Sequence, residues 1–332
     1  MYSHSKVDSI KIVGLGKCLP KRILTNLDLE KMVDTSEDWI TTRTGIKERR
    51  IVDKEYASIL GSDASLKALK RASIKPKDVE LIIVATITPD TQFPSTACYI
   101  QKDIGAKNAA VLDVSAACAG FVYALGLAWS LVGGGFYKNA LVVGSEILSS
   151  ITDWKDRSTC ILFGDGAGAC VVVPAKPSSG MLGMYLGGDG NFADLLILPA
   201  GGSRLPAANQ TVKKRLHYIK MQGNELFKIA VRIMVECAQK VLKKCGLKNS
   251  DLDLLIPHQA NLRIINAVAK RLNLTQEQVF VNIHKYGNMS SASTAVALCE
   301  AYEQGRIKKG DIVVLDAFGG GLVWGSCVIK WT

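Results

Sequence analysis

Two stretches of the chain share one pattern of apolar and polar positions almost residue for residue. Residues 67–83 run KALKRASIKPKDVELII, and residues 240–256 run KVLKKCGLKNSDLDLLI. Each begins as the end of an amphipathic helix, passes through a turn containing Pro76 or Asn249, and finishes in an apolar run of strand length. The pattern predicts a helix–turn–strand unit that occurs twice.

Further segments extend this repeat, because a helix, a strand and a glycine-rich turn entering another strand recur in the same order. They are 126–135, 141–144 and 163–173 in the first half, and 296–305, 312–315 and 318–330 in the second. Alternating strands and helices predict an α/β architecture with mostly parallel sheets. Proline and serine cluster near 173–177, which predicts two units, 1–174 and 175–332.

The repeat carries a geometric prediction. The alignment that pairs Gly135 with Gly305 also pairs Cys118 with Asn288, so both would start equivalent helices and converge on one site between the halves. The first of these helices lies within 114–137, a stretch without any charged residue that is long enough to cross a bilayer. Its scattered small residues favour a buried core helix and no membrane span.

Composition narrows the class of protein. The chain has 332 residues, 48% of them hydrophobic and 21% charged, enough for about two domains with a large core. Its nine cysteines form no C-x-x-C pair, which argues against a zinc ribbon or a disulfide-stapled secreted domain and predicts a cytoplasmic location. The net charge of +11 favours an anionic partner, but no nucleic-acid-binding motif accompanies it.

Cys118 is the strongest candidate for a nucleophile. Residues 111–121, VLDVSAACAGF, predict a strand, a tight turn and a helix, with Cys118 at the junction. The positive end of a helix dipole favours a thiolate and lowers a cysteine pKa. A buried structural cysteine fits the same local pattern, so the assignment depends on partner residues.

Two candidate partners follow other predicted strands. His258, in IPHQANLRI, comes after a buried strand and before a helix, where the sites of α/β proteins gather. Asn288, in YGNMSSAS, lies in a second turn of this kind, although G-N is also ordinary turn chemistry. His284 competes with His258, but we expect it to be structural because it falls where a strand should be ending.

These segments together resemble the β-ketoacyl-acyl-carrier-protein synthase III family over nearly the whole chain. The motifs are DTSEDWITTRTGIKERR (34–50), FPSTACYIQ (93–101), DVSAACAGF, STCILFGDGAGA (158–169), PHQANLRI, YGNMSSAS and AFGGGLVWGS (317–326). The resemblance implies a thiolase-like fold, with duplicated αβαβα halves in five α-β-α-β-α layers. It also implies an acyltransferase that initiates fatty acid synthesis: an acyl group, expected to be acetyl, passes from CoA to a cysteine and condenses with malonyl-acyl-carrier protein as carbon dioxide leaves.

The family pattern assigns the catalytic groups. Cys118 would carry the acyl group, and His258 and Asn288 would donate hydrogen bonds to the enolate oxygen formed by decarboxylation. The backbone N–H groups of Cys118 and Gly319 would form an oxyanion hole, since glycine lets a backbone approach a ligand closely. Without the resemblance, the glycines at 319–321 fit a plain tight turn equally well.

The resemblance also assigns residues that handle CoA. Trp39 and Arg157 would clamp the adenine, Arg43 would meet the phosphates, and Asn261 would bond the pantetheine arm. The alternative is a packing role for the tryptophan and solvated charges for the arginines. GDGAGA at 164–169 precedes a strand rather than a helix, so no nicotinamide cofactor is expected, and neither is a metal.

The family resemblance also assigns residues that contact partner proteins. Arg263, Lys270 and Arg271 would dock the acidic carrier protein, although each could be an ordinary solvated helix charge. Phe93 resembles the residue that one subunit of a homodimer contributes to the acyl pocket of the other, where its bulk would favour an acetyl primer.

Other hypotheses stay open on the sequence alone. A papain-like protease has Cys, His and Asn in the same order but needs different neighbours around its cysteine. A thiolase would need a second catalytic cysteine near the final glycine-rich turn, and Cys327 lies beyond that turn. A condensing enzyme of secondary metabolism and a non-catalytic acyl-binding subunit also fit.

Overall fold

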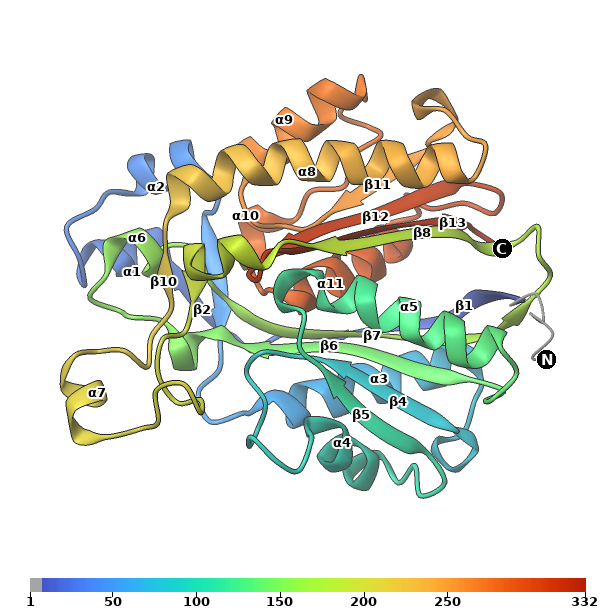
Figure 1. The fold of residues 1–332 in the computed structure, drawn as a ribbon, viewed down its shortest axis with the longest axis horizontal. Helices are drawn as coiled ribbons and strands as arrows, with labels where there is room; N and C mark the ends of the chain where they lie inside the picture. The colour runs from blue at the N-terminus through green and yellow to red at the C-terminus, as the bar shows by residue number, and fades with distance from the viewer. Residues whose placement is uncertain (1–7) are drawn as a thin grey trace.

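The protein is built on two β-sheets, as seen in a computed structural model that describes residues 8–332 (Figure 1). The strands of the first sheet stand in the order β1 (Ser9–Cys18), β7 (Asp165–Ala175), β6 (Ala140–Ile147), β4 (Leu81–Ala85) and β5 (Ala110–Val114). Those of the second stand in the order β11 (Leu254–Pro257), β12 (Ile312–Gly319), β13 (Val323–Lys330) and β8 (Gly180–Gly188).

Both sheets are mixed, so the prediction of mostly parallel sheets was wrong. Parallel pairs join β4 to β5 and β6, and β11 to β12. β7 is antiparallel to β6 and β1, and β13 is antiparallel to β12 and β8. In each half the last strand starts at the end where its neighbour finished, so it needs no helical crossover and runs antiparallel.

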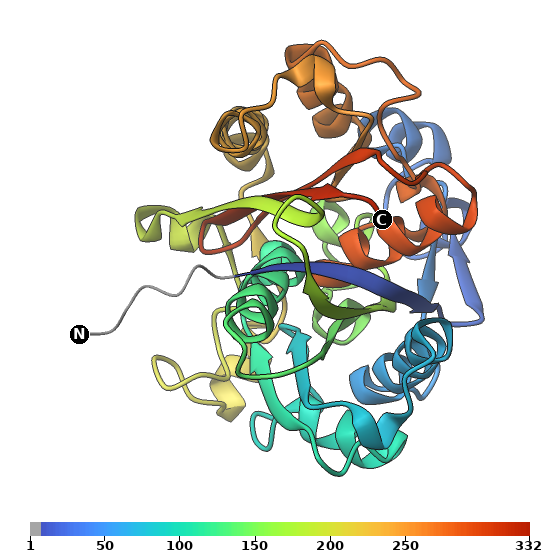
Figure 2. The same cartoon turned by 90° about the vertical axis from the view of Figure 1, so that its right-hand side faces the viewer.

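Helices cover and separate the sheets in five layers (Figure 2). The outer helices on the first sheet are α3 (Ala57–Ala72) and α4 (Thr96–Ile104), and those on the second sheet are α8 (Gly223–Lys244) and α9 (Leu262–Leu272). Between the sheets lie α5 (Gly120–Gly133) and α11 (Ser291–Glu303). The largest apolar cluster surrounds this central pair, so the α-β-α-β-α order implied by the family resemblance is confirmed.

The predicted repeat is present as well. α3, the 3-10 turn η1 (Pro76–Asp78) and β4 match α8, the 3-10 turn η5 (Asn249–Asp251) and β11, while α5 and β6 match α11 and β12. The chain passes from the first sheet to the second between the end of β7 and the start of β8. Within the uncharged stretch, residues 120–133 form α5, which is buried on one side but leaves Leu127 and Ser130 exposed. No helix of residues 8–332 is both long and apolar enough to span a bilayer.

Short elements close the end of the molecule where β5, β11 and β12 finish. They are β2 (Arg22–Thr25), α1 (Asn26–Glu30), α2 (Glu37–Thr44), β3 (Glu48–Ile51), η2 (Ala117–Ala119), η3 (Leu148–Ile151), α6 (Arg157–Cys160), η4 (Gly190–Leu195), β9 (Leu196–Ile197), α7 (Asn209–Lys213), β10 (Lys220–Met221) and α10 (Ile283–Tyr286). The fully buried Arg49 on β3 joins several of them, because its guanidinium donates to the carbonyls of Leu24 and Ile161 and to the Asn26 side chain.

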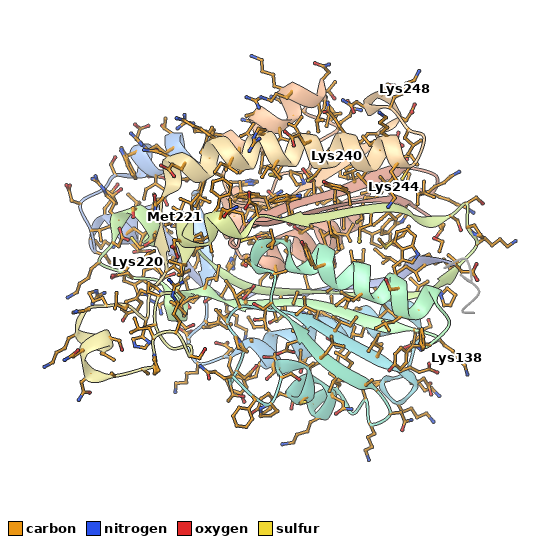
Figure 3. All side chains as sticks on the ribbon, in the orientation of Figure 1. Lys138, Lys220, Met221, Lys240, Lys244 and Lys248 are labelled. Carbon is orange, nitrogen blue, oxygen red and sulfur yellow. The ribbon has the colours of Figure 1, made fainter. Side chains whose placement is uncertain are left out.

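Part of the positive charge lies on the outer surface of the second half. The exposed lysines Lys240, Lys244 and Lys248 follow one another along the last turns of α8 and the loop after it (Figure 3). Lys240 stacks on the Tyr185 ring at 5.1 Å and donates to its hydroxyl at 3.3 Å.

Candidate active site

Cys118 sits on the 3-10 turn that joins β5 to α5. Its predecessor Ala117 has a φ of 42°, a left-handed conformation that is uncommon for a residue with a side chain and turns the chain sharply before the helix. The side chain of Cys118 is 6% exposed and lies just ahead of the N-terminus of a core helix. The predicted strand–turn–helix is therefore present, with a 3-10 turn at the junction.

Gly319, the last residue of β12, lies against the backbone of Cys118. A Cβ atom added at Gly319 would fall 2.6 Å from the Cys118 nitrogen, closer than real Cβ contacts come. Glycine is needed here because only its backbone can approach a neighbouring chain so closely. The two backbones predicted to form an oxyanion hole are thus direct neighbours.

His258 follows β11 and is fixed through its backbone, whose N–H donates to the Asp316 carbonyl at 2.7 Å. The side chain is 2% exposed, and neither ring nitrogen has a hydrogen-bond partner among residues 8–332. Buried polar atoms normally find partners, so two free ring nitrogens in a cavity wall point to a ligand. Burial lowers the pKa of His258 to about 3, which makes the imidazole neutral, with one donor and one acceptor nitrogen.

Asn288 is held on both sides of its backbone. Its N–H donates to the Leu162 carbonyl at 2.8 Å, and its own carbonyl accepts from the Gly164 N–H at 3.0 Å. Its side-chain oxygen accepts from the Ser290 N–H at 2.8 Å, which leaves the amide nitrogen as the group that can donate to a bound molecule.

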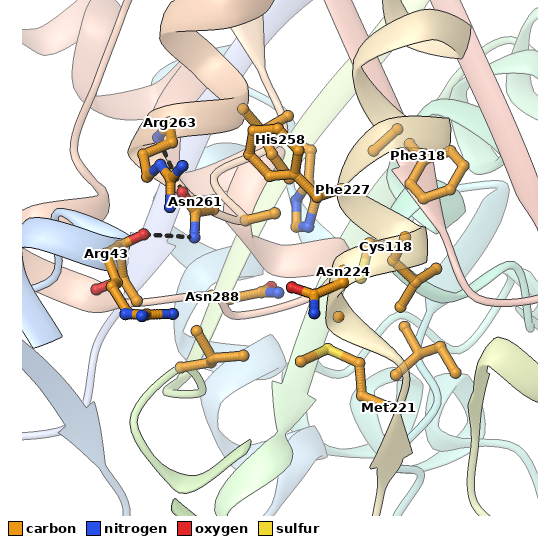
Figure 4. Close-up of a pocket in the computed structure, with 18 of the residues that line it drawn as sticks. Arg43, Cys118, Met221, Asn224, Phe227, His258, Asn261, Arg263, Asn288 and Phe318 are labelled. Atoms are coloured by element: carbon orange, nitrogen blue, oxygen red, sulfur yellow. Dashed lines mark hydrogen bonds between the residues drawn. The ribbon is translucent and has the colours of Figure 1, made fainter. Parts of the chain in front are cut away.

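These three side chains line one cavity of about 640 Å³, although Cys118 and Asn288 are 170 positions apart in the sequence. Figure 4 shows Cys118, His258 and Asn288 around its floor, with Asn224, Phe227 and Phe318 beside them. The cavity size falls in the range of roughly 300–1,000 Å³ that is typical of small-molecule sites. The convergence expected from the repeat is what the fold produces, since the loops before α5 and α11 and after β11 and β12 meet at the same end of both sheets.

The protonation state of Cys118 differs from the expectation. Burial raises the pKa of the Cys118 thiol to about 12, and the nearby Glu146 carboxyl group acts in the same direction. The helix N-terminus was expected to lower this pKa, but the loss of hydration in the buried turn outweighs that effect. The resting site therefore combines a thiol with a neutral imidazole rather than a thiolate–imidazolium pair.

A second cavity, of about 400 Å³, shares Cys118, Phe163 and Leu196 with the first. Most of its wall is aliphatic, and its lining residues include Ile87, Leu148, Ile151, Leu198, Ile219 and Val323. Phe93 does not line it and is 86% exposed. Any role of Phe93 in an acyl pocket therefore requires a second copy of the chain.

The three residues predicted to hold a nucleotide form a stack. Trp39 and Arg43 lie one turn apart on α2, which starts at the Ser36 cap and stops at Gly45 with φ +77°. The guanidinium carbons of Arg43 and Arg157 lie 4.8 and 5.0 Å from the Trp39 ring centroid. An indole ring with two guanidinium groups close to it offers an aromatic surface to a base and positive charge to its phosphates.

Asn261 and Arg263 stand at the wall of the same cavity, at the start of α9 (Figure 4). The Asn261 side chain caps the helix by accepting from the Arg263 N–H at 2.8 Å, and it donates to the Arg43 carbonyl at 3.0 Å. Lys270 and Arg271 are exposed in the last turn of α9 and do not line the cavity. The three predicted docking residues thus extend along one helix, away from the cavity.

Several lining residues escaped the sequence analysis. Phe318 lies within a quoted motif but was given no role, while Asn224 and Phe227 come from the first turns of α8, where no sequence feature distinguished them. His284 lies on α10 and does not line the cavity. Cys327 is fully buried within β13, so it cannot serve as a second catalytic cysteine.

The layered fold and this reactive cavity define a thiolase-fold condensing enzyme, a class that transfers acyl groups. Two family models match: one described as 3-oxoacyl-[acyl-carrier-protein] synthase III at residues 112–190, and its C-terminal counterpart at residues 242–331. The chain is 58% identical to the β-ketoacyl-[acyl-carrier-protein] synthase III of Caldanaerobacter subterraneus subsp. tengcongensis, with 97% of each chain covered. The chain belongs to the β-ketoacyl-acyl-carrier-protein synthase III family.

Solved structures agree with this assignment. The 3-oxoacyl-[acyl-carrier-protein] synthase III of Aquifex aeolicus superposes with a TM-score of 0.90 at 49% identity, covering 97% of this chain and 100% of that one. A priming β-ketosynthase of the R1128 polyketide pathway has the same TM-score at 35% identity, covering 98% and 97%. Enzymes of secondary metabolism thus share the fold at lower identity, and the papain-like hypothesis is wrong.

Proposed function

We propose that this enzyme condenses an acyl-CoA primer with malonyl-acyl-carrier protein to start fatty acid synthesis, using Cys118, His258 and Asn288. The observation that supports this best is a single cavity lined by the Cys118 sulfur, by the Asn288 side chain, and by an imidazole whose two nitrogens have no hydrogen-bond partner among residues 8–332. Family membership supports the reaction class, and the stacked Trp39 supports CoA as the first substrate.

In the first half-reaction the Cys118 sulfur attacks the thioester carbonyl of acyl-CoA. The thiol proton is transferred to the departing CoA sulfur, so a new C–S bond and a new S–H bond form as the old ones break. The carbonyl oxygen becomes negative in the transition state, and the backbone N–H groups of Cys118 and Gly319 stabilise it. A thiol with a raised pKa suits this order of events, because the thiolate is generated only when a substrate is bound.

In the second half-reaction the malonyl thioester loses carbon dioxide. The electron pair of the broken C–C bond moves onto the thioester oxygen, to which His258 and Asn288 donate hydrogen bonds. The enolate carbon then attacks the acyl-Cys118 carbonyl, and the Cys118 sulfur leaves and takes up a proton from solvent, which replaces the one that left with CoA. The neutral side chains of His258 and Asn288 are sufficient here, because hydrogen bonds stabilise the enolate oxygen without a positive charge.

The second cavity is the site we assign to the acyl chain, because it is apolar and touches Cys118. β5 lies at the edge of the first sheet, and Phe93 is strongly exposed, which supports a homodimer in which the partner subunit's Phe93 shortens this cavity and favours acetyl. We further propose that the acidic carrier protein docks along α9 on Arg263, Lys270 and Arg271, in a salt-sensitive manner.

We also propose a cellular compartment for the enzyme and the absence of a cofactor requirement. All nine cysteines are free, which supports a reducing compartment such as the cytoplasm. The proposed reaction uses only side chains, backbone N–H groups and the substrates, and needs no metal or cofactor.

Intact-mass spectrometry after exposure to acyl-CoA tests the function directly. We expect the wild type to gain one acetyl group from acetyl-CoA, Cys118→Ala to gain none, and Cys327→Ala to behave as the wild type. The same assay with longer acyl-CoA primers should show that Phe93→Ala accepts longer chains than the wild type. A persistent adduct on Cys118→Ala, or no adduct on the wild type with any primer, refutes the assignment.

A further inference from the structure

Pro257, the last residue of β11, interrupts the hydrogen bonds along one edge of the second sheet. Leu255, two residues earlier, pairs with Val279 in parallel. Its N–H donates to the Gln278 carbonyl at 2.7 Å, and its carbonyl accepts from the Phe280 N–H at 2.9 Å. Every second residue of a strand faces the same neighbour, so the next bonds of this ladder fall to Pro257. Proline has no N–H to donate, and the ladder of backbone bonds stops there.

The side chain of Gln259 fills this interruption. Its amide nitrogen donates to the Pro257 carbonyl at 2.8 Å and to the Phe280 carbonyl at 3.1 Å. Its oxygen accepts from the N–H groups of Asn282 at 3.0 Å and Ile283 at 3.2 Å. The side chain is fully buried, and these four bonds use both of its donor hydrogens and both acceptor positions of its oxygen. Gln259 thus replaces the missing peptide N–H and joins the end of β11 to the start of α10.

The two segments joined in this way carry the two side chains that we assign to the enolate. His258 lies between Pro257 and Gln259, and Asn288 follows the last residue of α10 by two positions. Asn282, the residue before α10, makes no side-chain cap, so the Gln259 oxygen is the acceptor for the first N–H groups of this helix. The His258 ring nitrogens have no partner within residues 8–332, so the backbone and the packing around it must place this imidazole.

α10 is held on its other side by α11. The Asn282 side chain donates to the Glu300 carboxyl group at 2.8 Å, and the Tyr286 hydroxyl donates to it at 3.1 Å. Loss of Gln259 therefore leaves α10 attached to α11 and removes its connection to the end of β11. Gln259 itself lines neither cavity, so it does not reach a substrate.

We propose that Gln259 sets the spacing between His258 and Asn288 and so acts selectively on the decarboxylation step. Both side chains must donate to one developing enolate oxygen, which makes their separation critical. Acyl transfer uses the Cys118 sulfur and the backbone N–H groups of Cys118 and Gly319, none of which Gln259 contacts. Gln259 is a positioning residue, and this inference rests on the proposed roles of His258 and Asn288.

Gln259→Met removes all four hydrogen bonds while keeping a side chain of similar length. We expect decarboxylation of malonyl-acyl-carrier protein to become on the order of 100-fold slower, the effect of displacing a catalytic group by about 1 Å. The loss should fall on kcat with little change in KM, because the two donors stabilise the enolate more than the bound thioester. Acylation by acetyl-CoA should stay within about three-fold of the wild type, since a variant that spares one step has lost interactions needed only in the other.

The two steps are measured separately. Release of labelled carbon dioxide reports decarboxylation in a Cys118→Ala background, and single-turnover intact mass reports acylation when Cys118 is present. His258→Ala and Asn288→Ala should each slow decarboxylation. If neither does, the proposed function fails and this inference fails with it; if both do while Gln259→Met does not, only the inference is wrong.

Gln278→Met is the matched control. Gln278 also joins the chain around β11 to the segment before α10, because it donates to the Leu252 carbonyl at 2.7 Å and accepts from the Thr275 N–H at 3.1 Å. These bonds lie at the opposite end of β11 from His258. Gln278→Met should lower the melting temperature but leave both steps within about three-fold of the wild type, because no catalytic group is displaced.

A second substitution separates positioning from stability. Pro257→Ala restores a backbone N–H, so the double variant Pro257→Ala, Gln259→Met can close the ladder directly and should melt at a higher temperature than Gln259→Met. Direct bonds between backbones bring the segments closer together than an interposed side-chain amide does, so decarboxylation should stay at least about ten-fold slow. Recovery of decarboxylation together with the melting temperature, or equal slowing of acylation and decarboxylation in Gln259→Met, overturns the proposal.

Discussion

Replacing Gly319 by alanine tests the contact between the end of β12 and the Cys118 turn. The added Cβ would lie 2.6 Å from the Cys118 nitrogen and 3.2 Å from both the Ala117 Cβ and the Ala119 nitrogen. Ordinary contacts of this kind begin at 3.4 Å, so the two backbones must separate by about 0.8 Å, the difference between 3.4 and 2.6 Å. The separation affects both N–H groups that we assign to the oxyanion hole.

The expected loss of acylation rate in Gly319→Ala follows from the geometry required for catalysis. Misplacing a catalytic group by about 1 Å can cost about 100-fold in rate, and losing one oxyanion-hole donor costs about 10²–10³-fold. We expect Gly319→Ala to slow acylation by acetyl-CoA about 100-fold, equivalent to about 2.7 kcal/mol of activation free energy. Acetyl-CoA binding should change little, because the contact lies at the reacting carbonyl rather than at the nucleotide.

Single-turnover acylation followed by intact mass measures the effect, and thermal melting shows whether the variant is folded. Gly61→Ala is the control, because its Cβ would meet the tip of the Ile100 side chain at the same 2.6 Å, but on the outer helix α3 and against a flexible group. It should acylate within about three-fold of the wild type. If a folded Gly319→Ala acylates as fast as Gly61→Ala, the proposed oxyanion hole is wrong.

Two further predictions concern the imidazole and the aromatic stack. Because the pKa of His258 is about 3, the rate of malonyl decarboxylation by Cys118→Ala should be independent of pH between about 5.5 and 8. A pH–rate profile that changes with a midpoint near 6.5 would contradict the view that His258 acts as a neutral donor. The unfolded chain binds this proton near pH 6.5, so the contribution of His258 to stability should diminish as pH falls from 6.5 towards 3, measurable by thermal melting. Trp39→Ala should raise the KM for acetyl-CoA about ten-fold with little change in kcat, because it removes the aromatic ring that lies against Arg43 and Arg157. Acetyl-pantetheine lacks the nucleotide, so its KM should not change. Equal losses for both substrates would argue against adenine binding at Trp39.

The sequence predicted the repeat and the convergence of Cys118 with Asn288 for a physical reason. A strand followed by a turn and a helix places the turn residue at one edge of the sheet, and a duplicated unit places two such turns face to face. The helical periodicity and the apolar runs of strand length at 67–83 and 240–256 were enough to locate the matching helices and strands.

Properties that depend on the depth of burial and on packing could not be predicted from the sequence. The direction of the Cys118 pKa depends on how completely the turn is buried, which no local pattern encodes. Asn224 and Phe227 enter the cavity because α8 begins beside it, a consequence of how the second half folds back. Glu146 is the one acid in the apolar strand ALVVGSEI, but its hydrogen bond to Ser291, 145 positions later in the sequence, could not be predicted from a local pattern.

The placement of Cys118 on the wall of both cavities has a consequence for the order of events. Under the proposed mechanism, an acyl chain that enters through the first cavity passes the sulfur and settles in the apolar second cavity before an extender occupies the first. To leave through the first cavity, the β-keto product must withdraw its chain past the sulfur, so each added methylene anchors it more firmly. Turnover with long primers would be limited by departure of the product rather than by bond formation, and a burst of product in the first turnover is the kinetic signature to seek.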